Sequence, residues 1–561
     1  MAATTDKPAD KFSFLIPLPS LWGSSILLIA LLMALPVLVV ASFIFQPVND
    51  NWHHLVDTLL VDYVTNSLLL LVGVSAGVLS IGVITAWLTS MCEFPGRRLL
   101  SWALLLPMAI PAYIIAYTYT GMLDFEGPLQ TQLRDWFGWS YGDYWFPEVR
   151  SLGGATMMLS LVLYPYVYMM ARAAFLEQSL CVLEVSRTLG NTPFAGFIRV
   201  ALPLARPAIV TGLSLALMET LADYGTVQYF GISTFTTGIF RIWYGMGDSG
   251  TAAQLSAMLL AFVFALILLE RWSRQRAKFH HTSNKYSRIH RFQLSGGKAW
   301  LAMVACALPL LFGFALPALQ LLQWTLSSAE NTLDGSFAVL AFNSVTLASL
   351  TAVIAVALAL LLAYGKRLHN TTLINSSVRI SALGYAVPGT VIAVGVLLPL
   401  AWIDNTFDSW MRNTFQISTG LLLSGTLFAL VFAYTVRFLS VSIQAVESGL
   451  DKINHSLDDA GRSLGLSPIQ ILRSIHLPMM KGTLLTALLL VFVDVLKELP
   501  ATLILRPFNF NTLAVRAYEM AADERLADAG APALMIVLAG IIPVLVLNHA
   551  ISRSRAGRVK S

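Results

Sequence analysis

Residues 184–203 read EVSRTLGNTPFAGFIRVALP, and residues 459–478 repeat the pattern as DAGRSLGLSPIQILRSIHLP. Each stretch has an acidic residue, then Arg and Gly at three-residue intervals, and ends in Leu-Pro. A Gly can end a first helix by taking the left-handed conformation. Thr192 or Ser467 can then cap a second helix that begins with Pro and ends near the closing Pro. Both stretches therefore predict a helix–turn–helix.

The repeat extends beyond these two stretches. Gly190 and Gly465 lie 275 positions apart, and Asn66 and Asn343, which each precede a Ser, lie 277 apart. An internal duplication of this length predicts two halves in the same orientation. Parallel repeats suit a transporter with a substrate path between them. A duplicated scaffold without a pore is the alternative.

The composition places the chain in a membrane. Nonpolar types make up 56% of the 561 residues and charged types only 12%, whereas a soluble protein carries about 25% charged residues. This excludes a soluble enzyme, a nucleic-acid-binding protein and a disordered chain. A span needs about 20 mostly apolar residues. The twelve predicted spans are 21–45, 64–92, 99–122, 151–171, 208–230, 251–269, 299–329, 337–364, 380–403, 417–436, 482–505 and 531–550.

The basic residues set the orientation. Twelve spans put both termini on one side, and 28 of the 36 Lys and Arg residues then lie on that side. The positive-inside rule predicts cytoplasmic termini in an inner membrane. The predicted divisions are a cytoplasmic N-terminal tail (1–20), a first transmembrane half (21–270), a basic cytoplasmic linker (271–298), a second transmembrane half (299–550) and a cytoplasmic C-terminal tail (551–561).

Four carboxylates interrupt the predicted spans. Glu219 and Asp223 are four residues apart and share a helix face, and 275 positions later stand Asp494 and Glu498. Ionisable residues within a membrane are costly and usually functional, and hard oxygen ligands suit hard cations. We expect these four residues to line the translocation path. The alternative is a structural role: the carboxylates could pair with a basic neighbour (Lys497, Arg241 or Arg516) or cap a helix end.

The sequence predicts no chemistry on this chain. Gly297-Lys298 and Gly365-Lys366 lack the following Ser or Thr of a P-loop. The Cys and His residues show no metal-ligand spacing, so no metal site is assigned. We expect a transporter subunit that is not an enzyme, without a cofactor and without a nucleic-acid partner.

The two twenty-residue stretches resemble the EAA loops of ABC importer permeases. The departures are Val185-Ser186 and Ala460-Gly461 in place of Ala-Ala, and Asp459 in place of Glu. The resemblance implies that each loop docks on a separate ATPase subunit, present in two copies, which binds ATP and Mg. The implied coupling residues are Glu184, Arg187, Gly190, Pro193, Pro203, Asp459, Arg462, Gly465, Pro468 and Pro478.

Two further stretches narrow the resemblance. Residues 219–231 read ETLADYGTVQYFG and residues 496–502 read LKELPAT, similar to the fused permease subunits of ferric-iron (Fe3+) ABC importers. This implies an all-α membrane protein of about twelve transmembrane helices, as two parallel six-helix repeats of the MetI-like permease fold. It also implies import of Fe3+ from the periplasm to the cytoplasm, with a periplasmic iron-binding protein as a partner. A thiamine permease, or a twelve-span secondary transporter of another class, remains the alternative.

Overall fold

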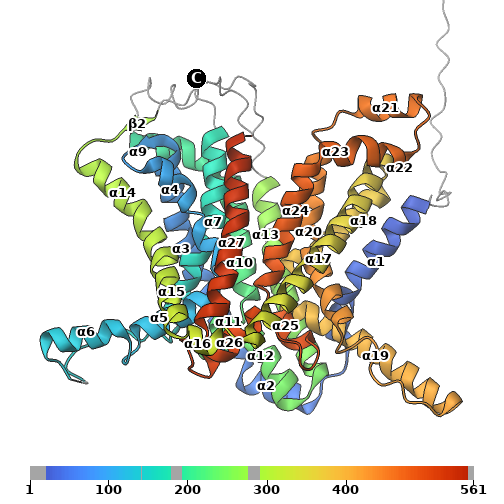
Figure 1. The fold of residues 1–561 in the computed structure, drawn as a ribbon, viewed down its shortest axis with the longest axis horizontal. Helices are drawn as coiled ribbons and strands as arrows, with labels where there is room; N and C mark the ends of the chain where they lie inside the picture. Colours follow the sequence, from blue (N-terminus) through green and yellow to red (C-terminus); the bar gives the residue numbers. More distant parts are fainter. Residues whose placement is uncertain (1–20, 141, 178–192, 276–290, 554–561) are drawn as a thin grey trace, which may run out of the picture.

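A computed structural model of the chain describes residues 21–140, 142–177, 193–275 and 291–553. In these residues the protein is a bundle of long helices, with one pair of two-residue strands (Figure 1). We name the two ends of the bundle as Figure 1 draws them. The upper end carries α9, β2 and α21 to α23, and the lower end carries α2, α12, α16 and α26.

The helices of the two halves follow the same order, with short 3-10 or π turns labelled η. The first-half elements are α1 (Leu21–Ser42), η1 (Phe43–Phe45), α2 (Asp50–Thr58), α3 (Leu60–Met91), β1 (Cys92–Glu93), α4 (Arg97–Ala103), η2 (Leu106–Ala109), α5 (Ala112–Leu123), α6 (Pro128–Phe137), α7 (Leu152–Glu177), α9 (Pro193–Gly196), η3 (Phe197–Ala201), α10 (Leu202–Ala222), α11 (Gly225–Tyr229), α12 (Phe235–Phe240), η4 (Arg241–Met246) and α13 (Ser249–Gln275). The second-half elements are β2 (Phe292–Gln293), α14 (Gly297–Leu310), η5 (Leu311–Ala315), α15 (Leu316–Ser327), α16 (Ala329–Thr332), α17 (Gly335–Leu368), α18 (Thr372–Ser381), η6 (Leu383–Ala386), α19 (Gly389–Phe415), α20 (Leu427–Leu450), α21 (His455–Ser463), α22 (Pro468–Ile471), η7 (Leu472–His476), α23 (Leu477–Met479), α24 (Lys481–Leu496), α25 (Pro500–Leu505), α26 (Leu513–Ala522) and α27 (Gly530–Arg553).

The predicted spans each have a helical counterpart. Nine helices of the described residues are long and apolar enough to cross a membrane, and two bent helix pairs qualify when each pair is taken together. The shorter apolar helix within α27 matches the last predicted span. The all-α membrane fold predicted from the sequence is therefore confirmed.

The tenth span lies further along the chain than predicted. The apolar run 417–436 suggested a helix there, but the helix is α20, which begins only at Leu427. The residues before it are held as a loop by two carboxylates of α19. Asp408 accepts the backbone N–H groups of residues 419 and 420, and Asp404 accepts those of residues 422 to 424. The prediction was wrong because hydropathy alone does not register such capping contacts.

The first helix of each half packs on the other half. In Figure 1, α1 lies beside α17 and α18, while α14 lies beside α3 and α4. Glycine residues at these contacts allow the helices to approach closely. A side chain at Gly395 of α19 would strike the backbone of Pro36 in α1, and one at Gly121 of α5 would strike Trp324 of α15. The two strands also join the halves, since Cys92 pairs with Phe292 in parallel register.

Candidate functional site

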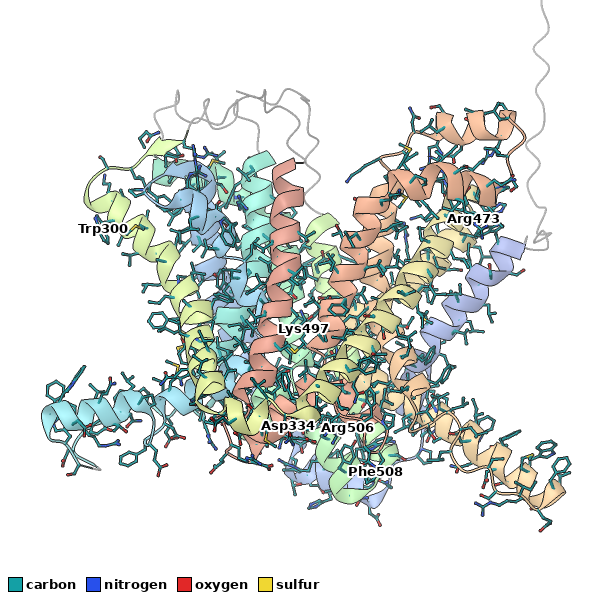
Figure 2. The ribbon with its side chains drawn as sticks, in the orientation of Figure 1. Trp300, Asp334, Arg473, Lys497, Arg506 and Phe508 are labelled. Atoms are coloured by element: carbon teal, nitrogen blue, oxygen red, sulfur yellow. The ribbon has the colours of Figure 1, made fainter. Side chains whose placement is uncertain are left out.

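A cavity lies between the two halves and brings all four predicted carboxylates together. It has a volume of about 110 Å³, room for several water molecules. Figure 2 places Lys497, one of its lining residues, near the middle of the bundle. The carboxylates on its wall are Glu219, Asp223, Asp494 and Glu498. The structure therefore brings the four predicted residues together in one cavity.

Equivalent helix breaks expose the carboxylates to this cavity. The helix α10 ends at Ala222 and α11 begins at Gly225, while α24 ends at Leu496 and α25 begins at Pro500. At the first break, Asp223 accepts hydrogen bonds from the Thr226 hydroxyl at 2.9 Å and from the backbone N–H of Val227 at 3.1 Å. At the second break, Glu498 accepts one from Ala501 N at 3.2 Å. Broken helices at the interface of two repeats are typical of transporter binding sites.

The carboxylates of the second half are neutralised by basic side chains. The Lys497 ammonium lies 2.8 Å from Asp494, and the Arg437 guanidinium lies 2.7 Å from Glu498. The alternative of internal pairing therefore holds for this half, with Lys497 as one of the two partners. Among the described residues, Glu219 has no hydrogen-bond or ion-pair partner. The free negative charge of the cavity thus lies on the first half.

Arg437 is the lining residue that sequence reasoning missed. The predicted tenth span stopped at residue 436, so Arg437 was assigned to the basic flank of the membrane. In the structure it lies within α20 and is only 7% exposed, and its Nε has no partner among the described atoms. The matching positions of the first half, 160–162, read Ser-Leu-Val, and Ala222 stands where Lys497 does. Both cations therefore belong to the second half alone.

The remaining polar groups of the cavity are phenols. Tyr113, Tyr166, Tyr224 and Tyr385 line it, and the buried hydroxyl of Tyr113 has no hydrogen-bond partner in the described part of the chain. In the residues the structure covers, no three His, Cys, Asp or Glu side chains are close enough to hold a metal ion. The cavity is thus polar, with four carboxylates and two basic side chains on its wall.

The second EAA segment, residues 459–478, begins as the sequence predicted. Gly465 has a φ of 77°, the left-handed conformation that ends α21. Ser467 and Gln470 then form a reciprocal capping box, with Pro468 in the first turn of α22. Asp459 pairs with Arg462 at 3.6 Å, and both side chains are exposed. Glu184, Arg187 and Gly190 of the first loop lie outside the described residues.

The first EAA segment, residues 184–203, of which 193–203 are described, departs from the prediction. We expected its helix to end near Pro203, yet the helix passes this residue into α10, and residues 197–222 form one span. A π turn precedes the Leu-Pro pair in both halves and accommodates the missing N–H of the proline. The second segment does end near Pro478, where the chain bends by 80° into α24.

The apolar side chains of the two EAA segments are only partly exposed. Ile469 is 49% exposed, and Leu464 just before it is 81% exposed, so the second segment presents an apolar surface at the upper end. Phe197 instead packs on Trp87, with ring centroids 4.8 Å apart. Exposed apolar side chains at a loop tip are typical of a surface that a partner covers.

Comparison with known proteins identifies the family. Residues 78–279 and 355–556 each match the binding-protein-dependent transport system inner membrane component. The chain belongs to this family. It therefore holds two permease domains and is a multi-pass permease of ABC importers of the inner membrane, which overturns the alternative of a secondary transporter.

Individual relatives differ in what they are named for. The chain is 28% identical over 491 residues to the Fe(3+)-transport system permease protein FbpB 2 of Haemophilus influenzae, covering 87% of this chain and 89% of the relative. It is 27% identical over 209 residues to the molybdenum transport system permease protein ModB of Escherichia coli, covering 36% of this chain and 88% of that one. A crystal structure of a bacterial ABC transporter for import of the acidic polysaccharide alginate matches 46% of this chain and 95% of its own, at 15% identity and a TM-score of 0.35.

Proposed function

We propose that this chain is the permease subunit of an ATP-driven importer that moves ferric iron from the periplasm to the cytoplasm. The observation that carries the proposal is the net acidic cavity between the halves, in which four carboxylates outnumber two bases. A negative passage favours a cation over an oxyanion. A relative that spans most of both chains is named for Fe(3+) transport.

The partners follow from the same proposal. Two copies of an ATPase subunit dock on the upper end, one at each EAA segment, and carry the ATP and Mg. A periplasmic iron-binding protein docks on the lower end and releases its ion into the cavity. In this arrangement both termini are cytoplasmic, and this chain uses no cofactor of its own.

A transport assay with the assembled complex tests the substrate. The permease, its ATPase and the binding protein are reconstituted in liposomes, and ATP hydrolysis and uptake are measured with Fe(III), molybdate, sulfate and thiamine in turn. We expect stimulation and uptake with Fe(III) only. Stimulation by molybdate or sulfate would assign Arg437 and Lys497 to an anion path and overturn the iron proposal, as would stimulation by thiamine.

A further inference from the structure

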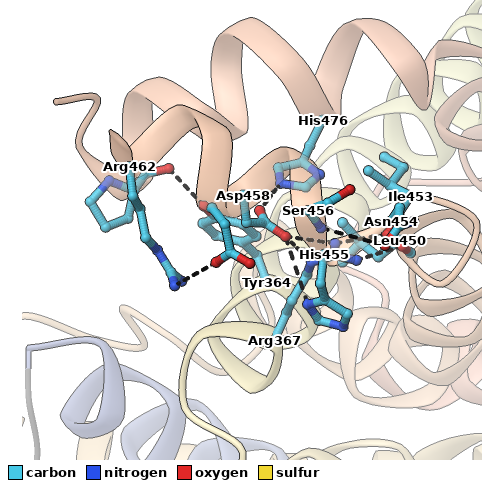
Figure 3. Close-up of polar contacts among 12 residues, drawn as sticks. Tyr364, Arg367, Leu450, Ile453, Asn454, His455, Ser456, Asp458, Arg462 and His476 are labelled. Carbon is cyan, nitrogen blue, oxygen red and sulfur yellow. Dashed lines mark hydrogen bonds and ion pairs between the residues drawn. The ribbon is translucent and has the colours of Figure 1, made fainter. Parts of the chain in front are cut away.

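A buried polar cluster fastens the second EAA segment to the long helix α17 (Figure 3). Arg367, in the last turn of α17, donates to Asp458 Oδ2 from Nε at 2.9 Å and from Nη2 at 2.6 Å. The other oxygen of Asp458 lies 2.6 Å from Nε2 of His476, the last residue of the π turn. The side chains of Arg367 and Asp458 are 8% and 7% exposed, and that of His476 is fully buried. Such a forked, charge-assisted arrangement fixes geometry as well as contributing energy.

The same helix holds the beginning of the segment. One turn before Arg367, Tyr364 donates its hydroxyl to the carbonyl oxygen of Pro468 at 2.8 Å. Arg367 also donates to the carbonyl oxygens of Leu450 and Ile453, at 2.6 and 2.8 Å, which fixes the end of α20. The start of α22 and the end of the π turn η7 are therefore both attached to the same turn of α17.

The helix α17 links this attachment to the lower end of the bundle. It has 34 residues, which corresponds to about 50 Å at 1.5 Å per residue. Near its other end Asn343 donates to the carbonyl of Asn511, and Ser344 Oγ accepts from Leu513 N at the start of α26. In the first half α3 repeats the lower contact, since Asn66 donates to the carbonyl of Ser233. Each half thus has one continuous helix between its EAA segment and its lower loops.

In the first half, different interactions attach α3 to the EAA segment. Trp87 and Ser90 occupy the α3 positions that match Tyr364 and Arg367, and Ala201 matches His476. Trp87 packs on Phe197 at 4.8 Å and on Phe175 at 5.4 Å between ring centroids. In its described part, the first EAA segment is therefore held to its long helix by aromatic packing, whereas the second is held by an ion pair and hydrogen bonds.

We infer that Asp458 is a positioning residue that locks the second EAA segment to α17, so that the two halves receive the movement of their ATPase subunits through chemically different attachments. The inference rests on the proposed docking of the ATPase at both segments. Loss of the Asp458 charge removes the ion pair with Arg367 and weakens the contact with His476, while the aromatic attachment of the first half is unchanged. ATP hydrolysis then continues with less transport for each ATP.

The test compares Asp458→Asn with Asp451→Asn, an exposed carboxylate at the end of the neighbouring helix. Hydrogen exchange of the full-length permease and binding of the ATPase subunit need no substrate. We expect faster exchange in residues 455–479 of Asp458→Asn, unchanged exchange in residues 60–91, and wild-type behaviour of Asp451→Asn. In liposomes with Fe(III), we expect uptake per ATP to fall about fivefold or more.

A conservative pair separates positioning from simple folding. His476→Gln keeps a side-chain N–H for Asp458 and should retain coupling, whereas His476→Ala should behave like Asp458→Asn. Equal exchange in Asp458→Asn and Asp451→Asn, or equal coupling in the two His476 variants, would overturn the inference. If the wild-type complex does not transport Fe(III), the iron proposal fails, and the exchange and binding measurements still decide the role of Asp458.

Discussion

Arg437 of α20 lies 2.7 Å from the carboxylate of Glu498 at the break between α24 and α25, and both side chains are more than nine-tenths buried. The pair ties two helices of the second half together at the wall of the cavity. A substitution that neutralises either residue would therefore report on stability as well as on transport. Removing one member of a buried pair strands the other charge without compensation.

Substitution of either member should therefore lower stability. We expect Glu498→Gln and Arg437→Met each to reduce the free energy of unfolding by about 3–5 kcal/mol. The double variant should lose less than the sum of the two, because no isolated charge remains. Thermal unfolding of the purified permease in detergent measures all three. Additive losses would mean that the two residues do not form a pair.

Gly389 should be intolerant of any side chain. A Cβ at this position would clash with the Arg437 guanidinium and the Glu498 carboxylate. We expect Gly389→Ala to cost about 1–3 kcal/mol through overpacking of the ion pair. Gly482→Ala is the matched control, since open space surrounds that helical glycine, and thermal unfolding should show no loss there. A neutral Gly389→Ala would contradict this packing.

Glu219 is the carboxylate whose neutralisation should affect transport most directly. Because no partner holds it in the described structure, Glu219→Gln should leave stability unchanged and remove the free charge of the cavity. We expect Fe(III) uptake in liposomes to fall about tenfold, equivalent to about 1.4 kcal/mol. Glu330→Gln, an exposed carboxylate at the lower end, serves as the control. Wild-type uptake by Glu219→Gln would remove this residue from the path.

Asp248 at the lower end should confer a pH-dependent stability. Burial alone would raise its pKa, but hydrogen bonds from Asn51, Thr251 and Asn49 hold the pKa well below the usual range. A depressed carboxyl pKa contributes stability that is present above the ordinary pKa and lost as the pH falls through the folded value. We expect Asp248→Asn to lose about 1 kcal/mol at pH 7.

The variant and the wild type should converge in acid. Thermal unfolding from neutral pH to below pH 4 measures the difference, which should be constant above the ordinary Asp range and shrink below it. A difference that does not shrink as the pH falls below the ordinary Asp range would mean that the Asp248 charge does not contribute to stability at the lower end.

The sequence predicted the spans and the carboxylates because both depend on local pattern. The duplication located Glu219, Asp223, Asp494 and Glu498, and the four side chains do share one cavity. Capping at Ser467 and Gly465 also followed from residue type. These features need no knowledge of distant contacts.

The features that the sequence did not predict depend on contacts across the fold. Arg437 was missed because Asp404 and Asp408 hold an apolar stretch as a loop and shift α20 along the chain. Asp459 drew attention through its spacing, but its neighbour Asp458 is the carboxylate that is buried and bonded. The sequence pattern alone does not distinguish two adjacent aspartates. Their roles are set by Arg367 and His476, which lie elsewhere in the sequence.

The exchanged first helices constrain the order in which this protein can be completed. The helix α1 is synthesised before the other described helices, yet its packing partners α18 and α19 belong to the second half. The face of the first half beside α3 and α4 is covered only when α14 has been made. Neither half can therefore finish folding before synthesis of the other is well advanced. Two separately expressed halves should assemble only when both are present in one membrane, whereas a single chain supplies them in equal number.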